Sequence, residues 1–120
     1  MGVLAVLLGA FGAHGLKPHL SADQVDTYQT GIFYHFIHVL AMLALITLSG
    51  RYHENRLRIA FYAFLIGIFM FSGSIYLLAC KDLLELKSFV KVLGPITPLG
   101  GLCFIFGWIM LILAAQKRKE

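Results

Sequence analysis

Three histidines stand in segments that are otherwise apolar, which makes them the first candidates for chemistry. His35 and His38 are three residues apart in TGIFYHFIHVLAM (residues 30–42), and Met42 follows on the same helical face. His14 lies in a separate apolar stretch. Imidazole and thioether groups bind copper and related ions, and His14 and His38 on different helices can ligate haem axially. A metal or haem site is therefore one hypothesis for this region.

The spacing of these residues is not specific to metal binding, however. No Cys-x-x-Cys-His motif or carboxylate partner accompanies the histidines, and a methionine at this spacing more often fills a core. Cys80 and Cys103 are far apart and lie within or at the edge of apolar segments, so they indicate neither a disulfide framework nor a zinc motif. We therefore predict no metal and no other cofactor.

The segments that carry these residues are typical of a membrane protein. The 120-residue chain is 59% hydrophobic and only 13% charged, whereas soluble domains are nearer 25% charged. Its charges are confined to short stretches between long uncharged windows. We predict one integral membrane domain spanning residues 1–120, an all-α bundle of four transmembrane helices with short loops, at about 1–16, 22–48, 57–80 and 97–116. The first span is short, about 24 Å as a helix against a hydrocarbon core of about 30 Å.

The connections between these spans carry helix signals of their own. Ser21 and Gln24 form a predicted capping box at the start of the second helix. The segment KDLLELKSFVKVL (81–93) places its apolar residues on one helical face, which predicts an interfacial helix between the third and fourth spans. Thr97-Pro98 reads as an N-cap followed by proline at the first helical position, which places the start of the fourth helix there.

The distribution of charge predicts an orientation. Six Lys and Arg residues fall in the 49–58 loop and the carboxyl-terminal tail, and four fall on the other side (Lys17, Lys81, Lys87 and Lys91). The positive-inside rule then places both termini in the cytoplasm. The net charge of +4 is explained by this orientation and by anionic lipid headgroups, so we expect membrane lipids as partners and no nucleic acid.

Small residues are expected to hold the helices together, because lipid tails are as apolar as leucine and packing must supply the attraction. Gly2, Ala5, Gly9 and Gly12 form a stripe on the first helix, and Gly100, Cys103 and Gly107 form one on the fourth. Such stripes serve either internal packing or self-association. The predicted packing glycines are Gly9, Gly12, Gly73, Gly100, Gly101 and Gly107.

Polar side chains gather in the halves of the spans away from the 49–58 loop. We predict one polar cluster or ligand-binding site near the outer face, formed from His14, Tyr34, His35, His38, Ser72, Ser74, Tyr76 and Thr97. Polar groups in a membrane are costly, usually face the bundle interior and suggest function. They equally serve as hydrogen bonds between helices, worth about 0.6–2 kcal/mol each.

Four motifs resemble the YgdD family of small bacterial inner-membrane proteins, which is related to the eukaryotic transmembrane protein 256. They are LLGAFGAHGLK (7–17), TGIFYHFIHVLAMLAL (30–45), GIFMFSGSIYLL (67–78) and GPITPLGGLCFIFGW (94–108), and together they cover nearly the whole chain. The resemblance implies a small multi-span protein of the bacterial plasma membrane, with mitochondrial association in eukaryotic relatives and no known substrate.

The resemblance also assigns family positions. It carries a family histidine onto His14, a Tyr-x-x-x-His pattern onto Tyr34 and His38, Phe-Ser-Gly-Ser-x-Tyr onto Phe71–Tyr76, and Ile-Thr-Pro-Leu-Gly-Gly onto Ile96–Gly101. His35 departs from the family, whose members often carry glutamine there. The pair is therefore interpreted as one shared histidine, His38, with a local neighbour.

These observations favour a structural or accessory component of a membrane assembly, associating with other membrane subunits or with itself. No nucleophile–base pair is readable, so no enzyme is predicted. The absence of a mid-span Asp or Glu argues against a proton-coupled exchanger. Two alternatives stay open: an outer-leaflet metal, haem, lipid or small-ligand site built from His14, His38 and Ser72–Tyr76, and passive transport of a small solute.

Overall fold

The computed structural model describes residues 1–116, and its regular elements are all helices. In chain order they are α1 (Gly2–Phe11), a π-helical turn (Gly12–Leu16), a 3₁₀ turn (Lys17–His19), α2 (Ala22–Leu48), α3 (Glu54–Gly67), a second π-helical turn (Ile68–Ser72), α4 (Gly73–Ala79), a 3₁₀ turn (Lys87–Phe89) and α5 (Val90–Ala115). The predicted all-α architecture is confirmed.

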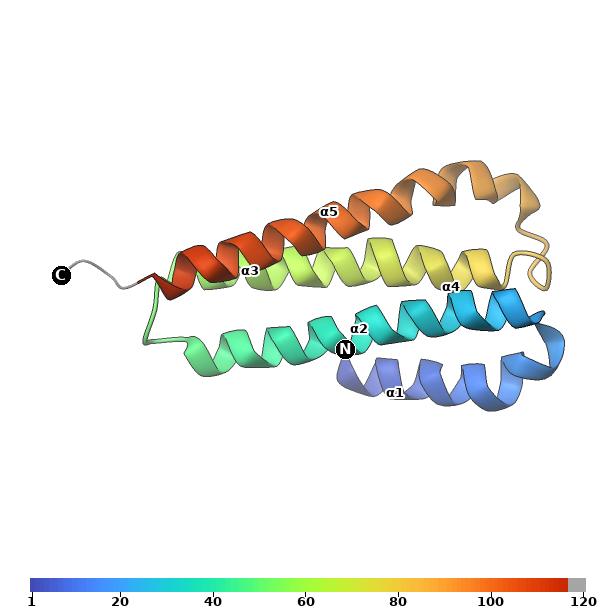
Figure 1. Cartoon of the computed structure of the whole chain (residues 1–120), viewed down its shortest axis with the longest axis horizontal. Helices are drawn as coiled ribbons and strands as arrows, with labels where there is room; N and C mark the ends of the chain where they lie inside the picture. Colours follow the sequence, from blue (N-terminus) through green and yellow to red (C-terminus); the bar gives the residue numbers. More distant parts are fainter. Residues whose placement is uncertain (117–120) are drawn as a thin grey trace.

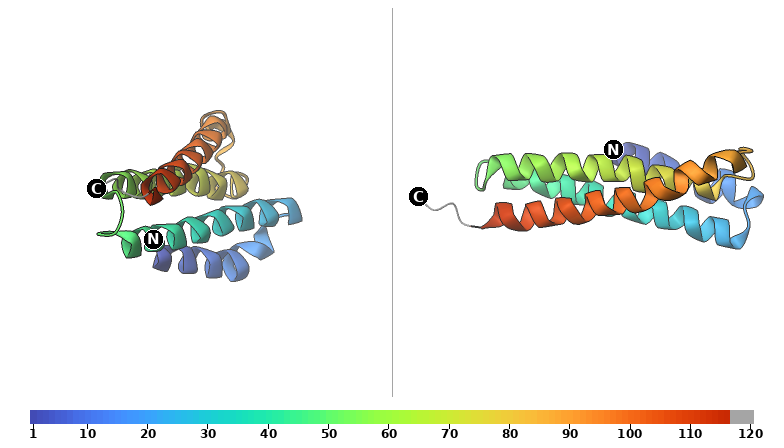
Figure 2. Two further views of the ribbon diagram at one scale, coloured as in Figure 1. Left: turned by 60° about the vertical axis from the view of Figure 1, so that its left-hand side comes forward. Right: turned by 90° about the horizontal axis from the view of Figure 1, so that it is seen from above.

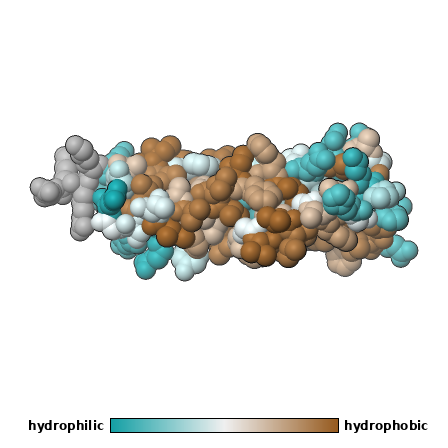
Figure 3. Space-filling view, turned by 90° about the horizontal axis from the view of Figure 1, so that it is seen from below, coloured by the Kyte–Doolittle hydropathy of each residue, from teal (hydrophilic) through white to brown (hydrophobic). Residues whose placement is uncertain are grey.

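Three long rods make up the bundle and lie side by side (Figures 1 and 2). They are α2, the continuous segment Glu54–Ala79 that joins α3, the second π turn and α4, and the segment Lys87–Ala115 that contains α5. Each has 26 residues or more and is apolar enough to cross a membrane. On the face seen in Figure 3, the middle of the molecule is mostly hydrophobic, and hydrophilic residues lie toward both ends.

The amino-terminal helix differs from the other three in length. A Cβ built on Gly9 would lie 3.7 Å from Ile32, and one built on Gly2 would lie 3.6 Å from Val39. Met1 is therefore beside the middle of α2, and α1 covers only one half of that helix (Figure 1). α1 and the π turn that continues it run from Gly2 to Leu16, 15 residues against 26 or more in each of the three rods. The predicted four-helix bundle is therefore present, with three helices long enough to cross a membrane and a shorter amino-terminal helix.

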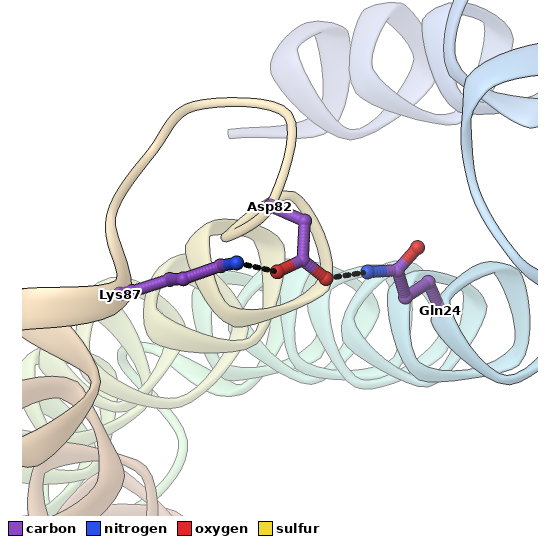
Figure 4. A network of polar contacts seen from close by, with 3 residues as sticks. All are labelled: Gln24, Asp82 and Lys87. Atoms are coloured by element: carbon purple, nitrogen blue, oxygen red, sulfur yellow. Dashed lines mark hydrogen bonds and ion pairs between the residues drawn. The ribbon is translucent and has the colours of Figure 1, made fainter.

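The predicted capping box at the start of α2 is present. Ser21 Oγ accepts a hydrogen bond from Gln24 N at 3.3 Å, and Ser21 N donates to Gln24 Oε1 at 2.9 Å. The amide nitrogen of Gln24 also donates to Asp82 at 2.8 Å, and Asp82 pairs with Lys87 at 3.7 Å (Figure 4). These contacts tie the start of α2 to the loop between α4 and α5.

The predicted interfacial helix at 81–93 is wrong. Residues 80–85 form turns, and Glu85 has a positive φ of 55°, which is incompatible with a continuing right-handed helix. Only the short turn Lys87–Phe89 follows before α5 begins at Val90. Leu83, Leu84 and Phe89 are nevertheless exposed in this loop, at the polar end of the molecule.

The fourth span also begins earlier than the predicted start at residue 97. Thr97 lies inside α5 instead of capping it, and its hydroxyl donates back to the Leu93 carbonyl at 3.3 Å. Pro95 and Pro98 are both interior to the helix, where each removes a backbone donor. Interior prolines bend helices, and α5 curves in this part of its length (Figure 1).

Candidate functional site

His38 bridges α2 and α5 through both of its ring nitrogens. Its Nδ1 lies 2.7 Å from the Tyr34 carbonyl oxygen, and its Nε2 lies 3.2 Å from Trp108 Nε1. The imidazole also stacks on Phe104, with ring centroids 3.5 Å apart and planes within 6°. The ring is buried and is held on three sides by aromatic or backbone groups.

These partners fix the protonation state of His38. A carbonyl oxygen only accepts, so Nδ1 must carry the hydrogen; an indole N–H only donates, so Nε2 must be the bare acceptor. The neutral Nδ1–H tautomer satisfies both contacts, whereas a second proton would oppose the Trp108 N–H. Binding a metal or haem iron through either nitrogen would break one of these bonds. The geometry thus favours a structural cross-link over a ligand.

His35 contacts a different helix from His38, although the two residues are only three positions apart on α2. Its Nδ1 lies 3.0 Å from the Tyr76 hydroxyl of α4, and its ring is 1% exposed. The other nitrogen, Nε2, is buried without a hydrogen-bond partner among the described residues, as is the hydroxyl of Ser72. Buried polar atoms of this kind are uncommon. The His35–Tyr76 pair joins α2 to α4.

Ser74 and Thr97 form a third link, between α4 and α5. Their hydroxyl oxygens are 2.7 Å apart, and the Ser74 hydroxyl lies 2.9 Å from the Phe71 carbonyl. Phe71 belongs to the second π turn, where the backbone is wider than in an α-helix. The pair therefore lies where α5 crosses the irregular part of the third rod.

His14 does not join these residues, so the predicted single cluster is wrong. Its side chain is exposed in the middle of the first π turn, and it forms no hydrogen bond with another of the described residues. The buried side chains of His38, His35 and Ser74 instead form separate pairs, with Trp108, Tyr76 and Thr97 respectively. The backbone carbonyl of Tyr34 accepts the hydrogen bond from His38, and its exposed ring packs against Phe71, with ring centroids 4.6 Å apart.

Two polar partners were missed by the sequence reasoning. Trp108 is not among the predicted polar residues, although the indole N–H of a tryptophan within a span needs an acceptor, and His38 supplies one. Tyr28 donates to the Leu8 carbonyl at 2.8 Å and so fastens α1 to α2. Both are aromatic residues with a donor inside an apolar segment, which is the signal that would have identified them.

Among the predicted packing glycines, three are in very close contact with a neighbour. A Cβ on Gly12 would meet the Tyr28 ring, one on Gly107 would meet Phe64, and one on Gly100 would lie 2.4 Å from the backbone nitrogen of Phe71. At Gly9, Gly73 and Gly101 the corresponding distances are 3.7–3.9 Å, which is ordinary van der Waals contact. Gly31 and Gly67 are close to aromatic rings as well, and the sequence reasoning did not select them.

The described residues show no cluster of three or more His, Cys, Asp or Glu side chains that could hold a metal ion. What the arrangement does chemically is join helices in pairs. α2 is bonded to α1 through Tyr28, to α4 through His35 and to α5 through His38. The central helix thus holds every other part of the bundle through a polar contact or an aromatic one.

Comparison with known proteins gives consistent results along the whole chain. The profile of a family described as "Protein of unknown function (DUF423)" matches residues 8–101. The UPF0382 membrane protein YwdK of Bacillus subtilis is 38% identical over 96% of this chain and 89% of its own length. A UPF0382 membrane protein of Haemophilus influenzae is 39% identical over 99% and 90%, respectively. None of the solved structures matches the chain.

Proposed function

Since this chain belongs to the DUF423/UPF0382 family of multi-pass bacterial membrane proteins, also known as the YgdD/transmembrane protein 256 family, we propose that it is a structural or accessory component of a membrane assembly rather than an enzyme. One observation carries this proposal. The buried side chains of His35, His38 and Ser74 are each hydrogen-bonded to a side chain of another helix, and both nitrogens of His38, the family histidine, are engaged. His35 Nε2 and the Ser72 hydroxyl are the buried polar atoms without a partner among the described residues.

The outer surface supports an assembly role. α5 is the least buried of the three rods, with only 17% of its most apolar window buried within the chain. Leu99, Leu102, Ile105, Ile109 and Ile112 are all exposed along it. Because so little of the surface of α5 is buried within its own bundle, the helix has an extended lateral face for lipids or for another membrane subunit.

The proposed location is the bacterial plasma membrane, with the carboxyl terminus and the 49–58 loop on the cytoplasmic side. The positive-inside count supports this orientation, although Lys117, Arg118 and Lys119 lie outside the described residues. α1 would then run from the cytoplasmic half toward the outer surface, where the 80–89 loop lies. An impermeant maleimide should label a Ser88→Cys variant in intact cells and leave an Arg51→Cys variant unlabelled; the reverse pattern would invert the topology.

The assembly role is tested by measuring the mass of the complex that the protein forms in its native lipid. The protein, expressed at its natural level with a small tag, is extracted in polymer-bounded native nanodiscs and weighed by native mass spectrometry. A complex with one other membrane protein in fixed stoichiometry is the expected result. Finding only monomers, in membranes whose protein complexes are otherwise intact, would contradict the proposal.

A further inference from the structure

An apolar groove of about 590 Å³ runs between α3 and α5 on the surface of the bundle. Ile59, Tyr62, Ile66 and Met70 line it from the third rod, and Leu99 and Cys103 line it from α5. Ala63 of α3 and Cys103 of α5 have the smallest side chains of the lining, which leaves room for a hollow between the two helices. The groove is not used by any of the polar links described above.

The end of this groove nearest the 49–58 loop is basic. One turn before its lining residues, α3 carries Asn55, four residues before Ile59, and Arg58, four residues before Tyr62. Residues at this spacing lie next to each other on a helix surface. Arg56, three residues before Ile59, reaches α5 and donates to the Leu113 carbonyl. Arg56 and Arg58 therefore belong to the helical turn of α3 next to this end of the groove.

Tyr62 connects the groove to a second hollow of about 210 Å³ at the same end, which Arg58 and Ser49 also line. The acidic member of that hollow, Glu54, is already engaged by the Ser49 hydroxyl and the Gly50 N–H. Arg58 is exposed, and no ion pair involving it is recorded among residues 1–116. The polar recess thus offers an unpaired cation beside an apolar slot.

The charge of the whole molecule favours an anion at this end. Counted along the sequence, six of the ten basic residues and two of the six acids belong to the end with the 49–58 loop and the carboxyl terminus. The opposite end has four of each, so the entire net charge of +4 belongs to one end. On the face seen in Figure 3, coloured residues toward this end include hydrophilic ones, which is where lipid headgroups would meet a membrane-spanning bundle.

The length of the groove matches one lipid leaflet. Its lining on the third rod extends from Ile59 to Met70, which is about 16 Å at 1.5 Å per residue. Half of a hydrocarbon core is about 15 Å thick. An acyl chain that begins at Tyr62 and Ile59 would therefore reach the middle of the bilayer where the groove ends.

From this geometry we propose that the α3–α5 groove binds one anionic phospholipid of the adjacent leaflet, its acyl chain in the slot and its phosphate on Arg58. Asn55 and the free donors of Arg56 complete the headgroup site. The bound lipid covers apolar surface that helix packing leaves open. The partner is a diacyl lipid with a net negative headgroup, such as phosphatidylglycerol.

The test is native mass spectrometry of the purified full-length protein, with phosphatidylglycerol or phosphatidylethanolamine of identical chains added to the detergent. The wild type should retain one phosphatidylglycerol in preference to phosphatidylethanolamine. Arg58→Gln should weaken phosphatidylglycerol retention by about fivefold, the contribution of one basic residue near a membrane surface. Arg58→Lys should restore most of it, and Arg51→Gln, which changes an exposed arginine in the loop, should leave it unchanged.

Filling the slot provides the second arm. Cys103→Phe should abolish retention of both lipids while the protein stays folded, as judged by its helical circular dichroism and elution volume. Equal retention of the two lipids, or equal losses for Arg58→Gln and Arg51→Gln, would overturn the proposal. So would a dimer that carries no lipid and dissociates in Cys103→Phe, because a second copy of the chain would then occupy the groove.

Discussion

The two halves of the bundle are held together by different means. From the middle of the membrane to the 80–89 loop, helices are joined by hydrogen bonds of His38, His35, Ser74 and Tyr28. Toward the 49–58 loop the core is an apolar cluster that includes Met42, Leu45, Leu57 and Phe64. The bond from Arg56 to the Leu113 carbonyl is a polar link at the end of this half. In lipid, a hydrogen bond fixes which helix faces which, whereas close packing supplies most of the attraction. The first half therefore specifies the arrangement and the second half stabilises it.

The largest effect is expected where the two halves meet, at Gly100. A Cβ there would lie 2.4 Å from Phe71 N, and backbone cannot move aside as a side chain does. Gly100→Ala should destabilise the bundle by about 3 kcal/mol through overpacking. Unfolding in mixed micelles of increasing denaturing detergent measures this loss. Gly101→Ala is the matched control, since its Cβ would lie 3.8 Å from the Phe71 ring. Equal stability of the two variants would show that α5 does not approach the π turn so closely.

Phe64 tests the apolar half. It is fully buried and contacts Trp108, with ring centroids 5.2 Å apart. Phe64→Ala should cost about 3 kcal/mol by leaving a cavity, measured by the same detergent titration. The control is Phe69→Ala, on the same rod but 60% exposed, which should change stability little. Similar losses for the two variants would contradict the assignment of Phe64 to the core.

His38 tests the polar half. His38→Phe keeps a ring to stack on Phe104 but removes the bonds to Trp108 and to the Tyr34 carbonyl. The expected loss is about 1 kcal/mol, together with a shift in the fluorescence of Trp108, the only tryptophan, because its indole loses its acceptor. His35→Phe should leave that emission unchanged. An unshifted spectrum in His38→Phe would show that the pair is not formed.

The smallest effect belongs to the link between Ser74 and Thr97. A double-mutant cycle with Ser74→Ala and Thr97→Val should give a coupling energy of about 0.6 kcal/mol, the average for hydrogen bonds between membrane helices. The unfolding titration of all four proteins measures it. Ser74→Ala combined with Thr47→Val, a threonine of α2 bonded to its own helix, is the control cycle and should show no coupling.

Sequence reasoning succeeded for features set by local rules. The long helices follow from apolar length, and the start of α2 follows from the reciprocal bonds of Ser21 and Gln24. It failed where tertiary contact or backbone irregularity decides. Amphipathic spacing predicted a helix at 81–93, but the positive φ of Glu85 interrupts it. Thr97-Pro98 carries a start signal that α5 overrides by adding Val90–Ile96 before it.

The sequence identified which polar residues lie within the membrane-spanning helices, but it did not identify which of them contact each other. Seven of the eight predicted residues lie in the spanning rods, but helical periodicity alone does not say which neighbour each one faces. His35 and His38 lie about 60° apart around α2, enough to face α4 and α5 separately. His14 was assigned by its place in the sequence, and its exposure on the first π turn could not be read from composition.

The π turn at Ile68–Ser72 acts as a phase shift within the third rod. One additional residue in a helical turn rotates everything beyond it by about 100° relative to an uninterrupted helix. A helical wheel drawn through Glu54–Ala79 with a single period would therefore misplace Ser74 and Tyr76 by a quarter of a circumference. Deleting one residue from this turn would restore the regular period, yet it would turn either the Phe64 face or the Ser74 face away from its neighbours. Both the Phe64 face and the Ser74 face point into the bundle because the helical phase before the π turn differs from the phase after it.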